Sequence, residues 1–117
     1  MIRGIHHVAI IASSEASVSF YAKLGFRETF RKERHYDTVV LMEGHGMQLE
    51  LFIDPNHPDR AVQPENKGLR HFALQVDSIE KTQKELGLAI GTVMHDWQNI
   101  PFVFITDPDG LPIELHE

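Results

Sequence analysis

Apolar and polar residues alternate along several short stretches of the chain, which is typical of strands with one buried face. The clearest is 47–53, where Met47, Leu49, Leu51 and Ile53 share one side and Glu50 lies on the other. Stretches rich in Ile, Val and aromatic residues extend the pattern, and glycines and prolines separate them. We predict strands at 4–11, 27–34, 36–42, 47–53, 68–76, 88–95 (interrupted by Gly91), 102–106 and 111–116.

A helical pattern follows the first and the fifth predicted strand. Ala16, Phe20, Tyr21 and Leu24 form one helical stripe, with Ser13 and Ser14 available as N-caps and Gly25 as the end. The run Asp77-Ser78-Ile79-Glu80 has the spacing of a capping box, and it predicts a helix that runs to Leu86 and stops at Gly87.

The order strand, helix, three strands therefore occurs twice, and the two copies are related by an offset of 64 residues. Identical residues at this offset cluster on the first and last strands of each copy: Gly4/Gly68, His7/His71, Ala9/Ala73, Ser14/Ser78, Glu50/Glu114 and Leu51/Leu115. We predict a duplicated βαβββ unit, with module 1 at about 1–53, a proline-rich linker at 54–67 and module 2 at 68–117.

Length and composition limit the functions to consider. A chain of 117 residues is expected to form one domain, and its formal charge of −6, with 11 basic and 17 acidic residues, argues against nucleic acid and anionic membranes as partners. It has no cysteine, so neither disulfides nor thiol chemistry are expected. We see no signal peptide and no apolar run of transmembrane length, and we expect a cytoplasmic protein.

Strand parity places two histidines and two carboxylates on matching faces of the two copies. His7, Glu50, His71 and Glu114 all fall on the side opposite the strongly apolar one, where they can line a concave surface. Two imidazoles and two carboxylates suit one divalent ion, such as Ni, Co, Zn, Fe or Mn. His116 shares the Glu114 side and is a weaker pocket candidate. We expect a structural role for His6 and solvent exposure for His35, His45 and His57.

Four segments resemble the vicinal oxygen chelate superfamily, which contains glyoxalase I, bleomycin resistance proteins and extradiol dioxygenases. They are the stretches 5–10, 48–52, 69–74 and 107–115, and 20–26 also resembles that family's first helix and its exit. The resemblance implies an α+β fold in which two tandem βαβββ modules form an open, cup-shaped sheet with helices on its outer face. It implies a single glyoxalase-like domain over 1–117, with His7, Glu50, His71 and Glu114 as ligands of one divalent ion.

The ligand set is most similar to that of bacterial glyoxalase I, so the resemblance implies a metal-dependent lyase or isomerase. Its small substrate would chelate the metal through neighbouring oxygens, with Glu114 or Glu50 moving a proton as general base while the metal stabilises an enolate. A protein that sequesters a small molecule, such as an antibiotic, and a metal-dependent dioxygenase remain alternatives. We expect a homodimer; the ligands can come from one chain or from two, and the substrate can be a glutathione adduct or another compound.

Overall fold

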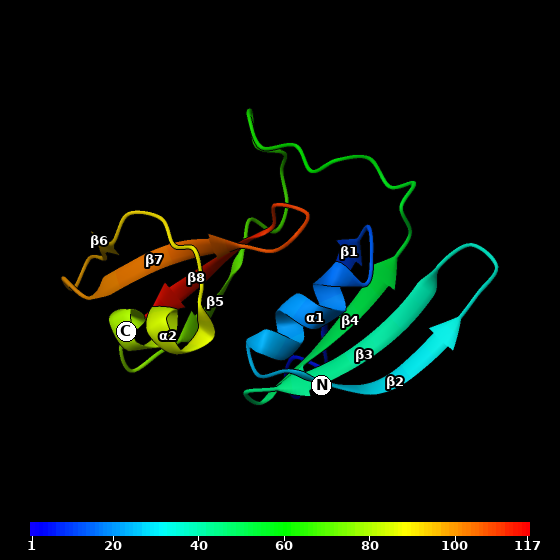
Figure 1. The fold of residues 1–117 in the computed structure, drawn as a ribbon, viewed down its shortest axis with the longest axis horizontal. Coiled ribbons are helices and arrows are strands. Elements are labelled where there is room, and N and C mark those ends of the chain that lie inside the picture. Colours follow the sequence, from blue (N-terminus) through cyan, green and yellow to red (C-terminus); the bar gives the residue numbers. More distant parts are fainter. The chain divides into compact units, whose positions relative to one another are not determined.

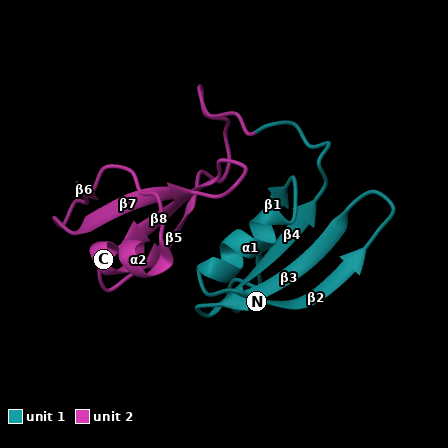
Figure 2. Cartoon of the chain, viewed as in Figure 1, with its two compact units in different colours: residues 1–59 teal, residues 60–117 magenta.

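Each half of the chain forms a four-stranded sheet with one helix, as the repeated pattern predicts (Figure 1). The computed structural model describes residues 1–117 and divides into two units, residues 1–59 and 60–117 (Figure 2).

Unit 1 contains a βαβββ module whose first and last strands are neighbours. The sheet order is β1-β4-β3-β2, with β1 parallel to β4 and the other neighbours antiparallel. The elements are β1 (Val8–Ala12), α1 (Ala16–Lys23), β2 (Arg27–Glu33), β3 (Thr38–Gly44) and β4 (Met47–Ile53).

Unit 2 repeats this topology. The sheet order is β5-β8-β7-β6, with β5 parallel to β8. The elements are β5 (Phe72–Gln75), α2 (Ile79–Leu86), β6 (Met94–His95), β7 (Pro101–Thr106) and β8 (Pro112–His116). The predicted α+β fold with two tandem βαβββ modules is therefore confirmed.

The helix of unit 1 covers the apolar face of its sheet. Leu49 and Leu51 of β4 are fully buried, and Leu51 is paired in register with the buried Val40 of β3. Arg31 of β2 is paired with Val40 as well, and its guanidinium forms an ion pair with Glu15 at the start of α1. Since α1 lies on this side, the opposite face of the sheet is the one that we call the open face of unit 1.

Unit 2 has the same division between a covered and an open face. Val103, Ile105, Ile113 and Leu115 alternate along β7 and β8 and are buried. The residues between them, among them Glu114, form what we call the open face of unit 2. α2 begins as the capping box predicts: the Ser78 hydroxyl accepts from the Lys81 N–H at 3.2 Å.

The structure differs from the sequence-based prediction at several ends. The first helix has Glu15 rather than a serine at its N-cap, although the Ser14 hydroxyl accepts from the Ala16 N–H at 3.2 Å. The predicted strand at 88–95 is reduced to Met94–His95. In the remainder of that segment, the Gly91 N–H donates to the Phe104 carbonyl at 3.1 Å. This single hydrogen bond connects the segment to β7 but does not make it a strand.

His45 is exposed, as predicted, and it also has a structural role. It lies in the turn between β3 and β4 with a positive φ of 55°. Its Nε2 is 2.7 Å from the Leu24 carbonyl, and its ring packs edge-on against Phe26. The turn is thereby tied to the end of α1.

Neither helix of the structure is long and apolar enough to cross a membrane.

Candidate metal centre

His71 and Glu114 form a close pair on the open face of unit 2. The His71 Nε2 lies 3.4 Å from the Glu114 Oε1, and the two side chains retain 22% and 16% of their exposure. The His71 ring also packs edge-on against Phe104, with 4.9 Å between the ring centroids. The pair is therefore partly shielded from water but open on one side.

The parallel register of β5 and β8 brings these two residues together. Ala73 is the register partner of Glu114, and His71 lies two residues before Ala73, immediately before β5 begins. Glu114 is also opposite Phe104 of the antiparallel neighbour β7. The Glu114 carboxylate thus lies between Ala73 and Phe104, where the diagonal neighbour His71 can contact it.

Unit 1 repeats the arrangement around Glu50. Ala9 is the register partner of Glu50 across the parallel β1–β4 pair, and Leu41 is opposite it on β3. His7 lies two residues before Ala9, as His71 does before Ala73. No hydrogen bond or ion pair joins His7 to Glu50; the His7 Nδ1 lies 2.9 Å from the His6 Nδ1 instead.

The donor types and the spacing of the unit 2 pair fit a divalent ion. Two ligands at about 2.1 Å from an ion and at right angles to each other are about 3 Å apart, close to the observed 3.4 Å. An imidazole nitrogen and a carboxylate oxygen both suit Ni, Co, Zn, Fe and Mn. Each unit contains two of the four predicted ligands. Neither unit by itself brings three His, Asp or Glu side chains together around a possible ion.

The surroundings of Glu50 are apolar. Its cross-strand partner Leu41 is paired on its other side with Phe30, which is 53% exposed, and Phe52 lies on the same side of β4 as Glu50. Ile11, the partner of Phe52, is 54% exposed.

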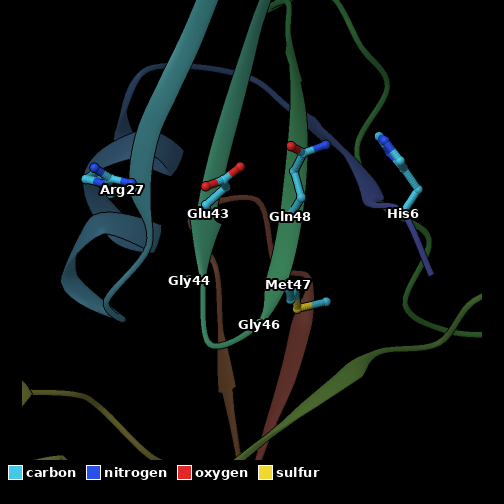
Figure 3. A pocket seen from close by; sticks show the side chains of 7 residues that line it. All are labelled: His6, Arg27, Glu43, Gly44, Gly46, Met47 and Gln48. Atoms are coloured by element: carbon cyan, nitrogen blue, oxygen red, sulfur yellow. The ribbon is translucent and has the colours of Figure 1, made fainter. Parts of the chain in front are cut away.

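A polar cavity of about 470 Å³ lies at the β3–β4 turn of unit 1 (Figure 3). Glu43 and Gln48 are register partners on neighbouring strands, and Figure 3 shows both extending to the same side, with Arg27 pointing away from them. The cavity is lined by His6, Arg27, Glu43, Gly44, Gly46, Met47 and Gln48. None of the four predicted ligands lines it.

His116, the weaker pocket candidate, forms a second polar cluster on unit 2, and the sequence did not reveal its partner Asp96. Its Nε2 lies 2.8 Å from the Asp96 Oδ2, and its Nδ1 is 2.8 Å from the Glu117 carbonyl. The hydrogen bond to Asp96 is the main cause that raises the pKa of His116. The N–H groups of Ile100 and Gln98 bind Asp96 and, with His116, lower the pKa of its carboxyl. His116 is thus held by a structural partner.

Comparison with known proteins gives one consistent result. A family model described as the Glyoxalase/Bleomycin resistance protein/Dioxygenase superfamily matches residues 4–115. The uncharacterized protein YwkD of Bacillus subtilis (strain 168) is 40% identical over 126 residues, covering 100% of this chain and 98% of that protein. A crystal structure of a glyoxalase family protein from Enterococcus faecalis has a TM-score of 0.90 and 38% identity, covering 98% of both chains.

A more distant solved structure shares the fold alone. It is a variant of the fosfomycin resistance protein FosX from Listeria monocytogenes, complexed with Mn(II) and 1S,2S-dihydroxypropylphosphonic acid. Its TM-score is 0.73 at 17% identity, and the match covers 99% of this chain and 93% of that one.

The His116–Asp96 pair predicts a pH-dependent contribution to stability. Because the pKa of His116 is raised in the folded chain, its contribution is fully present below the unfolded value of 6.5 and is lost as pH rises through the folded pKa. Between pH 6 and pH 9, the free energy of unfolding should therefore fall more for the metal-free wild type than for His116→Gln. Urea unfolding at both pH values measures this, and equal changes in the two proteins would contradict it.

Proposed function

The chain belongs to the glyoxalase/bleomycin resistance protein/dioxygenase superfamily, and we propose that it is a metal-dependent lyase or isomerase. Its substrate would be a small molecule with two neighbouring oxygen atoms that chelate the ion. The observation that carries the proposal is the His71–Glu114 pair at 3.4 Å, together with the matched placement of His7 and Glu50 in the repeated unit. Members of this superfamily often catalyse lyase or isomerase reactions and commonly bind a divalent metal, as FosX does with Mn(II).

The proposed ligands are His7, Glu50, His71 and Glu114, two from each unit. When bound, a divalent ion supplies Lewis-acid polarisation of the substrate oxygens. Each histidine packs edge-on against a neighbouring ring: His71 on Phe104 and His7 on His6. Ion identity stays open among Ni, Co, Zn, Fe and Mn, because nitrogen and oxygen donors suit all of them.

The carboxylates Glu114 and Glu50 are the candidate general bases. Each stands on an open face beside an apolar cross-strand partner, Phe104 for Glu114 and Leu41 for Glu50. One of them takes a proton from a substrate carbon next to a carbonyl and returns it to the adjacent carbon or oxygen, so the carboxylate is unchanged after a turnover. Apolar neighbours exclude water from the proton and limit its loss to solvent.

Metal binding is the first prediction of this proposal. The purified chain should bind about one divalent ion per set of four ligands, and His71→Ala should weaken binding by more than about 100-fold, since losing a ligand costs more than losing an outer partner. His35→Ala is a matched control, because His35 is exposed in the β2–β3 turn and outside the ligand set. Elemental analysis and calorimetry make the measurement; equal loss of metal in both variants would contradict the assignment.

Proton transfer by a carboxylate is the second prediction. In D₂O, the metal-loaded wild type should exchange the carbon-bound proton of one or more 2-hydroxycarbonyl compounds, followed by proton NMR. Replacing the base with glutamine should slow this exchange by about 100-fold or more. We therefore expect a large loss in Glu114→Gln or in Glu50→Gln.

Full exchange rates in both glutamine variants would rule out the proposed base. Tight stoichiometric binding of these compounds without exchange would instead indicate a sequestering protein, and oxygen uptake with catechols would indicate a dioxygenase.

A further inference from the structure

The residue that precedes each predicted histidine ligand contacts that histidine's Nδ1. In unit 1 the His6 Nδ1 lies 2.9 Å from the His7 Nδ1, and in unit 2 the Arg70 Nη1 lies 3.4 Å from the His71 Nδ1. His6 and Arg70 occupy the same place in the repeat. The two contacts differ in kind, because an imidazole can donate or accept whereas a guanidinium only donates.

The Arg70 contact fixes where the proton of a neutral His71 ring lies. A nitrogen that faces an arginine N–H must present its lone pair, so the proton is on Nε2. That Nε2–H then faces the Glu114 Oε1, which lies 3.4 Å away. A protonated nitrogen has no free lone pair for a metal ion. In this arrangement the His71 Nε2 therefore cannot bind a metal ion together with Glu114.

Metal binding at Nε2 requires the opposite tautomer. A ligating histidine usually donates its other ring N–H to a carboxylate, a carbonyl or water. In unit 2 a carboxylate is available close by: both oxygens of Glu65 lie 3.0 Å from the Arg70 Nε. The Arg70 hydrogen bond is the main cause that lowers the pKa of Glu65.

The Glu65–Arg70 pair can open at little cost. The side chains of Arg70 and Glu65 are 57% and 53% exposed, and exposed ion pairs contribute little to stability. The backbone is held independently of the pair, because Arg60 donates to the Arg70 carbonyl at 2.9 Å. The guanidinium can therefore turn away while His71 stays in place.

We propose that Glu65 and Arg70 form a latch that selects the protonated nitrogen of His71 and so controls metal binding. Arg70 on Nδ1 keeps the pair closed; when Arg70 turns away, Glu65 accepts the Nδ1–H and the Nε2 lone pair is free to bind the ion. The inference rests on the proposed role of His71 as a metal ligand. It makes Arg70 and Glu65 positioning residues with opposite effects on metal affinity.

Calorimetric titration of the metal-free full chain with Zn²⁺ or Co²⁺ tests the latch. Arg70→Met should raise the affinity about tenfold, and Glu65→Gln should lower it about tenfold, which is in the range seen for outer partners of metal ligands. Lys67→Met is the matched control. It removes the same charge from the same segment, and Lys67 makes no hydrogen bond or ion pair, so its affinity should equal that of the wild type.

The position of the proton is measured separately, by long-range ¹H–¹⁵N NMR of the metal-free proteins. We expect the His71 proton on Nε2 in the wild type and a shift toward Nδ1 in Arg70→Met. A proton on Nδ1 in the wild type would overturn the latch, as would affinities that move in the same direction in both variants or an equal gain in Lys67→Met. If the wild type binds no metal, the proposed function fails and the latch with it, whereas a proton misplaced in the NMR experiment overturns the latch alone.

Discussion

The alternation of side chains across each sheet is the constraint on which the candidate site depends. In unit 1 it buries Leu49 and Leu51 under α1 and leaves Glu50 on the open face. A slip of one residue in β4 would expose both leucines, at about 2 kcal/mol each, and bury an unpaired carboxylate at several kcal/mol more. The same residues that form the core therefore fix the direction of the candidate ligands.

Duplication repeats this arrangement in both units. In each unit the first and last strands of the module are parallel neighbours, so a histidine before one strand lies diagonal to a glutamate in the other. In unit 2 the diagonal residues His71 and Glu114 are in contact, whereas in unit 1 His7 contacts His6. The residues at positions 6 and 70 differ, so the two histidines have different neighbours at Nδ1.

Local features were predictable from the sequence, and contacts between distant segments were not. The strand Met47–Ile53 and the helix Ile79–Leu86 have the predicted bounds because alternation and capping act over a few residues. The strand expected at 88–95 was wrong over most of its length, because its pairing depends on the partner strand β7. The His116–Asp96 contact joins residues that lie 20 positions apart and meet only in the folded chain. The ligand assignment itself remains a prediction.

A crystal structure of the metal-loaded protein, with the ion located by its anomalous scattering, tests the central claim most directly. We predict one ion bonded to His7, Glu50, His71 and Glu114, with its imidazole nitrogens at about 2.1 Å. An ion held by only one unit's pair, or by other residues such as His116 and Asp96, would contradict the account.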